Sequence, residues 1–405
     1  MAARADRRRR RRRVAGAVVA AVLVLAIASV YATVAALHPL ARPAGWPPAS
    51  DLAEYTAVLH VHSAYSHDGR GSIEDIAAAA ARAGVRIVFL TEHNTLAPLA
   101  DGRERWYGDT LVLVGAEITT GSGYLLLLDP RPDLPTRARG FAVEDLVARY
   151  RAAGALVLLA HPEHPRLGWR GPLPAVDGIE VVDVFDQLMA VPYGRKAIGL
   201  LTYPANPVMA ILSWMHWPRS VLAEWDRLAA ERPTIGVLAL DAHGGIALSE
   251  ATDLTFPSHE TAFRIGRLHL LTGERLRRDA ADRARAVRAL RAGRFFNAFD
   301  GFAPADGFRF EVRSAAGRAV MGESVPFRQG QVAAIRVPPV GEARVRLLRN
   351  GAVLHEGPAG PDPVLVPLAG PGVYRVEVDL RMSLFPIGGD AWRPWIFSNP
   401  VYVLG

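Results

Sequence analysis

The chain contains no cysteine. Disulfide bonds, thiolate metal ligands and cysteine nucleophiles are therefore excluded as sources of its stability or chemistry. No glycine-rich fingerprint of the form G-x-G-x-x-G or G-x-x-x-x-G-K-[ST] follows an apolar run in the sequence. Its absence argues against a dinucleotide site or a P-loop.

Net charge is missing from most of the chain. The formal charge is +7, and residues 1–13 account for all of it, because eight arginines there oppose only Asp6. Residues 14–405 are thus formally neutral and present no basic field. We therefore expect no nucleic-acid duplex among the partners.

Residues 14–37 form an apolar run without a charged residue, directly after the arginines of residues 7–13. As a helix this run extends roughly 36 Å, which is enough to cross a bilayer. The positive-inside rule places residues 1–13 in the cytoplasm and the chain after residue 38 in the periplasm or outside the cell. The sequence therefore predicts a single-pass transmembrane signal anchor at 14–37, followed by a Pro-rich linker at 38–53.

A cleavable signal peptide is the alternative interpretation of this run. Ala32, Ala35 and Ala36 could supply a cleavage site, although the apolar region would be unusually long for a signal peptide. Both interpretations predict export, so they differ only in whether the helix stays attached.

Residues 54–302 alternate short apolar runs with Ala-rich helical patterns. The helical patterns end at Gly84 and Gly154, as expected for C-terminal caps. Such alternation predicts an α/β fold with a parallel sheet, and polar residues at the ends of the runs favour closure into a barrel over an open doubly wound sheet. The predicted strands cover residues 57–61, 85–90, 111–114, 155–160, 178–184 and 235–240.

Two segments do not follow this alternation of predicted strands and helices. Residues 193–232 are Trp-rich and predict an inserted helical pair packed on the barrel, with a substrate lid or a membrane-resting surface as alternatives. Residues 303–405 contain short alternating strands separated by Gly and Pro, which predict a small antiparallel β-sandwich domain.

Histidine and acidic residues recur where the apolar runs end. His60 and His62 have the i, i+2 spacing that sends two side chains of a strand to the same side, which suits one metal. His67 and Asp68 follow on a Gly-rich turn. The other strand ends present His93, Glu117, His161, Asp241 and His243.

The ordered motifs HVHSAYSHDGRGSIEDI, FLTEHNT, GAE, AHPE and DAHG resemble those of the PHP family, named for polymerase and histidinol phosphatase. The resemblance covers roughly residues 55–300. It implies a distorted (β/α)7 barrel that holds up to three metals, and an enzyme of the phosphoesterase or phosphatase class.

The resemblance also assigns ligands by position. His67 competes with Asp68 in this assignment, and Glu92 takes the place of the usual Asp of a TDH motif as a residue behind the ligands. A further ligand of the second metal is expected after the strand at 178–184, where Asp183, Glu180 or a water could serve. The implied ligand sets are His60, His62, Glu117 and Asp241 for the first metal, Glu117 and His161 for the second, and Asp68, His93 and His243 for the third.

Imidazole and carboxylate ligands without thiolate suit two or three Zn, Mn or Fe ions better than Ca. Arg70, Arg166, Arg170 and Arg264 lie near the motifs and could bind a substrate phosphate, or could be ordinary surface residues. The predicted function is metal-dependent hydrolysis of a phosphorylated small molecule or an envelope-derived phosphate ester. A metal-retaining binding or scaffold protein, or a hydrolase of a non-phosphate bond in an envelope glycan or lipid, stays open.

Overall fold

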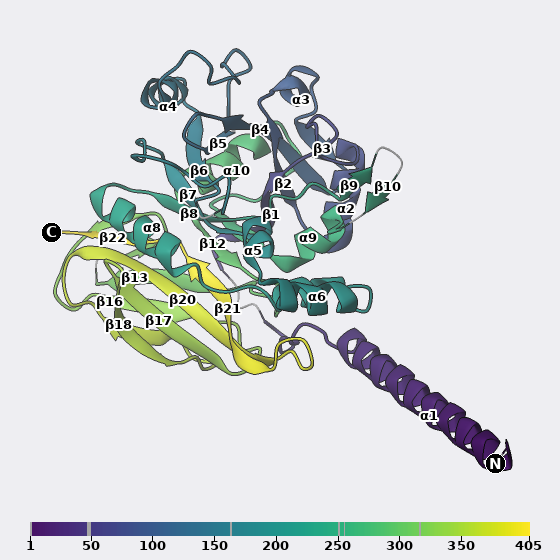
Figure 1. Cartoon of the computed structure of the whole chain (residues 1–405). Helices are drawn as coiled ribbons and strands as arrows, with labels where there is room; N and C mark the ends of the chain where they lie inside the picture. The colour runs from purple at the N-terminus through teal and green to yellow at the C-terminus, as the bar shows by residue number, and fades with distance from the viewer. Residues whose placement is uncertain (1, 47–49, 163, 250–251, 255, 316) are drawn as a thin grey trace.

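The computed structural model describes the whole chain except residues 1, 47–49, 163, 250–251, 255 and 316. A single helix, α1 (Ala2–Ala35), extends away from a body that consists of a barrel and a β-sandwich (Figure 1). Its segment Arg13–Ala35 is long and apolar enough to cross a membrane and is mostly exposed, although Val34 near its end is buried. Length and composition suit either a membrane span or a signal sequence.

Seven strands form the wall of the barrel, in the order β1-β2-β4-β5-β6-β7-β8. The pairs β1–β2, β2–β4, β6–β7 and β7–β8 are parallel, whereas β5 is antiparallel to both neighbours. The expectation of a fully parallel sheet is therefore wrong at β5, because residues 120–123 join β4 to β5 as a tight hairpin and parallel strands need a longer crossover. The strands are β1 (Ala53–Val61), β2 (Ile87–His93), β4 (Thr110–Thr119), β5 (Tyr124–Leu128), β6 (Leu156–Ala160), β7 (Gly178–Asp183) and β8 (Ile235–Ala239).

The barrel closes between β8 and β1 mainly at their carboxyl ends. There the backbone N–H of His62 donates to the carbonyl of Ala242 (2.9 Å), and that of Ala242 donates to the carbonyl of His60 (3.0 Å). At the other end, β11 (Arg267–Thr272) pairs antiparallel with β1, and β12 (Phe295–Ala298) pairs antiparallel with β11. Asn297 of β12 then bridges to the backbone of β8. This uneven closure makes the fold a distorted (β/α)7 barrel.

Helices cover the outside of the barrel. In α2 (Ile73–Ala83), Ser72 and Asp75 form a reciprocal capping box, and Gly84 ends the helix with a left-handed φ of 74°. The remaining small elements around the barrel are α3 (Ala97–Ala100), β3 (Arg105–Tyr107), α4 (Val143–Ala152), α5 (Val184–Ala190), β9 (Ile246–Ser249), β10 (Thr252–Leu254), α9 (His259–Ile265) and α10 (Asp282–Arg291).

Residues 193–232 contain three helices, so the expected pair is wrong. They are α6 (Tyr193–Thr202), α7 (Pro207–Leu212) and α8 (Arg219–Glu231). Trp225 of α8 is fully buried and donates its indole N–H to the carbonyl of Thr234 (2.9 Å), which begins the approach to β8. Thus α8 is the crossover helix between β7 and β8 rather than an addition to the barrel.

The C-terminal region is a sandwich of two sheets that shares a sheet and a core with the barrel. Strand β21 pairs with β12 of the barrel, in the register Phe296↔Ser398, and the pair β15–β22 is parallel within an otherwise antiparallel unit. One sheet contains β15 (Ser324–Pro326), β17 (Ala343–Arg349), β18 (Ala352–Pro358), β20 (Gly372–Ser383), β21 (Asp390–Ser398) and β22 (Val401–Leu404). The other contains β13 (Arg309–Ser314), β14 (Gly317–Val320), β16 (Val332–Arg336) and β19 (Val364–Pro367).

A buried charged cluster joins the barrel to the sandwich. His269 of β11 is fully buried between Glu54 (2.8 Å) and Asp300 (3.1 Å). Glu54 also accepts hydrogen bonds from the backbone N–H of Gly307 and from Arg309 (2.6 Å). Burial acts to lower the pKa of His269, but the two carboxylates outweigh it and raise this pKa to about 10.

The raised pKa of His269 predicts a pH dependence of stability. Its contribution is fully present below the unfolded-state pKa of about 6.5 and is lost as the pH rises through about 10. We expect His269→Gln to reduce the slope of the unfolding free energy between these limits by up to about 1 kcal/mol per pH unit. Urea unfolding of both chains over this pH range measures the slope, and equal slopes would contradict the prediction.

Candidate metal centre

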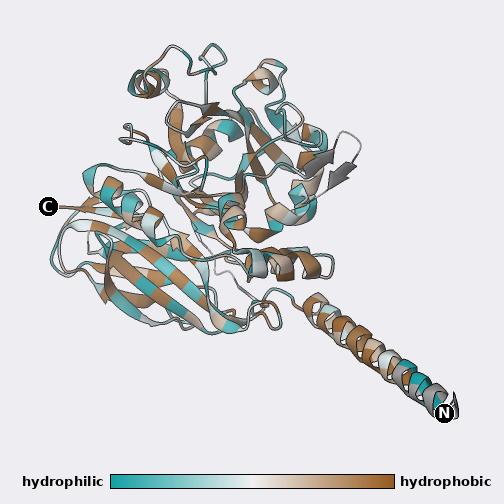
Figure 2. Ribbon diagram, in the orientation of Figure 1, coloured by the Kyte–Doolittle hydropathy of each residue, from teal (hydrophilic) through white to brown (hydrophobic). Residues whose placement is uncertain are grey.

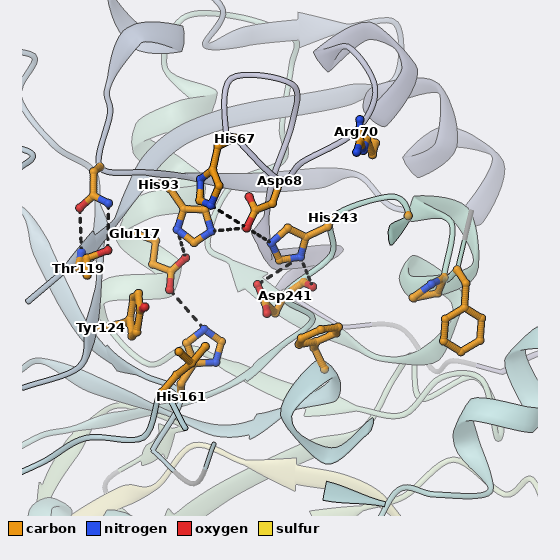
Figure 3. Close-up of a pocket in the computed structure, with 16 residues that line it drawn as sticks. His67, Asp68, Arg70, His93, Glu117, Thr119, Tyr124, His161, Asp241 and His243 are labelled. Carbon is orange, nitrogen blue, oxygen red and sulfur yellow. Dashed lines mark hydrogen bonds and ion pairs between the residues drawn. The ribbon is translucent and has the colours of Figure 1, made fainter. Parts of the chain in front are cut away.

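Five strands bring their carboxyl ends to one cavity of about 490 Å³. In Figure 3, Glu117 of β4 lies between His93 and His161, while Asp68 lies between His93 and His243. The cavity is lined by His67, Asp68, Arg70, His93, Asn94, Glu117, Thr119, Tyr124, His161, Leu167, Phe185, Asp241, His243, Gly245, Phe256 and Pro257.

An unusual backbone turns two of the histidines inward. Ala57 and Leu59 of β1 face the barrel interior and Val58 faces the outer core, so simple alternation would send His60 outward. Instead His60 has a φ of 64°, and the pairing of β1 with β2 shifts register there. His161 follows β6 with a φ of 51° in the same way. Left-handed φ values cost non-glycine residues about 1 kcal/mol or more, and such strain often marks functional sites.

Four buried ligand atoms meet in the deepest part of the site. The Nε2 atom of His60 lies 3.3 Å from both Glu117 Oε2 and Asp241 Oδ1. The Nε2 atom of His62 lies 3.5 Å and 3.2 Å from the same two oxygens. Because both imidazoles contact both carboxylates, a single ion could be held by all four side chains.

Glu117 connects this group to two more histidines. Its Oε1 atom lies 3.3 Å from His161 Nε2, while its Oε2 atom lies 2.9 Å from His93 Nδ1. The carboxylate therefore faces different imidazoles with its two oxygens, which is the arrangement of a bridging ligand.

A third group is more open to solvent. Asp68 Oδ2 lies 3.2 Å from His93 Nε2 and 3.5 Å from His243 Nε2. His67 also approaches Asp68 (3.5 Å), but its side chain is 78% exposed. The turn needs Gly69, because a Cβ there would lie 2.2 Å from the carbonyl oxygen of Ser63. The geometry thus favours Asp68 over His67 as a ligand.

The chemistry of these atoms fits divalent metals. Ligand atoms about 2.1 Å from one ion lie roughly 3.0–3.4 Å apart, which is close to the separations of 3.2–3.5 Å around His60 and His62. Several buried polar atoms of the four deepest ligand residues have no hydrogen-bond partner within the described part of the chain, although buried polar atoms normally have one. These atoms are Nε2 of His60 and His62, both carboxylate oxygens of Glu117 and Oδ1 of Asp241.

The pKa shifts describe an environment that favours added positive charge. Burial acts to lower the pKa of His60, but Glu180, Asp241 and Glu117 together hold it well above its usual range. Burial lowers the pKa of His62 to about 4, so this imidazole stays neutral with a lone pair free for a metal. Burial acts to raise the pKa of Glu117, but His60, His161 and His93 hold it well below its usual range.

Comparison with known proteins supports an assignment to a family. Residues 59–168 match the family model of the PHP domain, a segment that includes six of the eight ligands predicted above. The chain contains a PHP domain. No match was found among curated proteins.

Three solved structures are similar to this chain. A two-domain protein from Bacteroides vulgatus, described as containing a predicted PHP-like metal-dependent phosphoesterase, is 14% identical with a TM-score of 0.41; the match covers 89% of this chain and 99% of that one. PsfC from Pseudomonas syringae is 15% identical over 57% of this chain and 88% of its own, with a TM-score of 0.34. A putative metal-dependent phosphoesterase from Bifidobacterium adolescentis is 14% identical over 50% and 92%, with a TM-score of 0.32.

Carboxylates behind the ligands of the PHP domain orient their imidazoles. Glu180 contacts His60 Nδ1 (2.7 Å), and Asp186 contacts His161 Nδ1 (2.9 Å). Such contacts leave Nε2 of each ring facing the metal position. Asp183 lies on the same Nδ1 side, 3.7 Å from His60. Of the three alternatives for the further ligand of the second metal, Glu180 and Asp183 thus both lie on the Nδ1 side of His60, behind the imidazole.

Glu92 supports His62 through a hydroxyl group. Ser66 donates to Glu92 Oε2 (2.6 Å) and lies 3.2 Å from His62 Nδ1. Glu92 also accepts hydrogen bonds from the backbone N–H and the hydroxyl of Ser63. Glu92, which stands in place of the usual Asp, thus holds Ser63 and Ser66 of the turn that follows His62.

Removing the carboxylate of Glu180 behind His60 should weaken metal binding, although no metal ligand is removed. We expect Glu180→Gln to weaken metal affinity by about 10–100-fold, since this is the usual cost of losing a carboxylate behind a histidine ligand. Metal titration of the stripped chain measures the affinity. Glu356→Gln, on the exposed strand β18, provides the control, and an unchanged affinity in Glu180→Gln would contradict the assigned role.

The four arginines lie in different places. Arg70 lines the cavity of the PHP domain. Arg170 and Arg166 lie on the loop after His161, where Arg170 donates its backbone N–H to the carbonyl of Ser122, and neither lines the cavity. Arg264 pairs with Glu260 (2.9 Å) and does not line the cavity, which favours the alternative that it is an ordinary surface residue.

Several residues of the site carry no motif that sequence reasoning could detect. His259 contacts the carbonyl of His62 (3.1 Å), and burial lowers its pKa to about 4. A Cβ at Gly244 would lie 2.4 Å from the ring of His259, so the DAHG turn and this histidine fit only together. Tyr124 lies edge-on to His161 at the cavity wall. Their positions depend on contacts between segments far apart in the chain.

Proposed function

We propose that this protein is a metal-dependent phosphoesterase that acts outside the cytoplasm. The observation that carries the proposal is the position of Glu117, whose two oxygens face separate groups of imidazoles in a buried site. Its partners supply nitrogen and oxygen ligands without thiolate, which suit Zn, Mn or Fe. Two or three such ions, when bound, supply Lewis acidity that polarises a phosphoryl oxygen and acidifies a water molecule.

The chain's own residues hold and orient the reacting groups. His60, His62 and Asp241 would hold the deepest ion. Glu180 contacts Nδ1 of His60 and limits the motion of this ring. Arg70 provides a cation at the cavity wall for an anionic substrate. No nucleophilic side chain would be required, because a water molecule would supply the attacking oxygen.

The N-terminal helix supports a membrane-anchored location. We infer that Arg13–Ala35 spans the membrane, since arginines precede it and most of its apolar side chains are exposed. The barrel and sandwich then face the periplasm or the exterior, where they would meet a phosphorylated small molecule or an envelope-derived ester. A periplasmic reporter fused at residue 45 should be active, and a silent fusion would contradict this topology.

Purified full-length chain provides the test of activity. Metal analysis and a panel of phosphate esters should be applied to the wild type, His62→Ala and His355→Ala. We expect bound metal and hydrolysis in the wild type and His355→Ala, with both lost in His62→Ala. Full activity of His62→Ala would reject the site, whereas bound metal without any phosphoesterase activity would favour a scaffold or a hydrolase of another bond.

A further inference from the structure

The outer face of α6 is an apolar surface that the barrel does not cover. Leu201 is 68% exposed and Ile198 is 52% exposed, with Leu200 exposed beside them. The opposite face of α6 packs closely against Trp214, because a Cβ at Gly199 would lie 1.9 Å from its ring. Apolar side chains of α6 are therefore left exposed, and Figure 2 shows hydrophobic residues along this helix.

A second exposed apolar group lies close to α6. Phe385, at the tip of the hairpin between β20 and β21, is 67% exposed. Figure 1 shows this hairpin near α6 and the start of α1. Burial lowers the pKa of Arg393 of β21, and the nearby guanidinium of Arg195 on α6 lowers it further. The hairpin and α6 thus lie side by side.

The end of α1 is bound to this same region. The hydroxyl of Tyr31 donates to the carbonyl of Leu201. Asn206, just after α6, donates its side-chain amide to the carbonyls of Leu37 (2.7 Å) and Val34 (3.3 Å). The apolar helix therefore leaves the body directly beside α6.

The length of α1 sets the height of α6 relative to the membrane. A hydrocarbon core about 30 Å thick takes about 20 helical residues. Counted from Arg13, the last cation of the tail, this thickness ends near Thr33. Tyr31 lies only two residues before that point, or about 3 Å along the helix axis, and Tyr is favoured at this depth. Its contact with Leu201 therefore places α6 at the outer boundary of the bilayer.

We propose that α6 rests in the outer lipid interface of the membrane that α1 crosses. Ile198, Leu200 and Leu201 then contact the acyl-chain boundary. Arg195 and Lys196 of the same helix lie at the level of the lipid headgroups, as expected for an amphipathic helix in the plane of the interface. The lipid surface is the partner that covers this apolar face.

The helix in the interface also borders the metal cavity. Tyr203, which caps α6, packs edge-on against Phe256 (4.5 Å between ring centres), and Phe256 lines the cavity. Phe185 of α5, the helix that leads into α6, lines it too. One aromatic residue of the cavity wall thus touches the residue that caps α6, and a second lies on the preceding helix. If the proposed function holds, its substrate is a phosphate ester carried on a membrane lipid.

Labelling tests the position of α6 without any measurement of activity. The chain has no native cysteine, so Leu201→Cys and Leu404→Cys in the full chain each accept one fluorescent label. Leu404 is 51% exposed near the C-terminus, far from α1 in Figure 1. In vesicles with brominated acyl chains, we expect loss of fluorescence at position 201 and none at 404. Equal fluorescence at both positions would overturn the proposal.

Kinetics tests the substrate class. The double variant Ile198→Glu/Leu201→Glu should keep the wild-type kcat/KM on a water-soluble phosphate ester and lose about tenfold or more on a phosphate ester of a vesicle lipid. Equal values for the two chains on the lipid ester would reject the lipid substrate. If the wild type hydrolyses neither ester, the proposed function fails, while the label at position 201 still decides whether α6 contacts lipid.

Discussion

Glu117→Gln is expected to lower kcat/KM by about 10³-fold or more. The substitution keeps the size of the side chain but removes the charge that His60, His161 and His93 share. A loss of several kcal/mol of Lewis-acid stabilisation of the transition state corresponds to this factor, since each 1.4 kcal/mol of activation free energy changes the rate about tenfold. Steady-state kinetics with the best ester of the panel, together with metal analysis, measure the effect. The bound-metal stoichiometry should fall with the activity.

A matched variant separates this effect from a general change of charge. Glu311 is also a nearly buried glutamate, but it lies on β13 of the sandwich and pairs with Arg313. Glu311→Gln should retain its metal and its kcat/KM. A Glu117→Gln chain that keeps full metal content and wild-type kcat/KM would show that Glu117 does not bridge.

Metal removal is expected to destabilise the barrel. Without a cation, both oxygens of Glu117 and Oδ1 of Asp241 have no hydrogen-bond partner among the described residues, and buried polar atoms left unsatisfied are costly. Metal present at 1,000 times its Kd stabilises the folded state by about 4 kcal/mol. We therefore expect a chelator to lower the melting temperature of the wild type by roughly 5–10 °C, as measured by calorimetry.

The double variant His62→Ala/Asp241→Asn provides the control for chelation. It lacks two of the four deepest ligands, so the chelator should leave its melting temperature unchanged. A shift of the same size in both chains would show that the chelator acts elsewhere. An unshifted wild type that has lost its metal would show that the ions do not contribute to folding.

Much of the fold could be predicted because local patterns agree with it. The capping box of Ser72 and Asp75 and the left-handed Gly84 define the bounds of α2. The apolar runs predicted six of the seven strands of the barrel wall, but β5 (Tyr124–Leu128) was not among them, and the sharp turn before Tyr124 reverses its direction. Antiparallel pairing there depends on a short connection, and a rule of alternation between strands and helices does not detect it.

The candidate ligands could be named from their positions at strand ends, but their orientation could not. The alternation of β1 and β6 would turn His60 and His161 away from the interior, and only the left-handed backbone at both residues reverses this. Glu180 and Asp183 were two of the three alternatives for the further ligand that the resemblance implies after the strand at 178–184. Which side of an imidazole a carboxylate approaches depends on packing across strands, and that is not encoded in local spacing.

The sequence by itself determined the donor types, their order along the strand ends and the apolar helix that precedes the body. These features depend on composition and spacing within short segments, where side-chain periodicity follows directly from backbone geometry. The tertiary structure alone decided that the two oxygens of Glu117 face different imidazoles, that His259 supports the DAHG turn and that α6 meets the end of α1. Each of these contacts joins residues far apart in the chain, so only the packing of the complete fold brings them together.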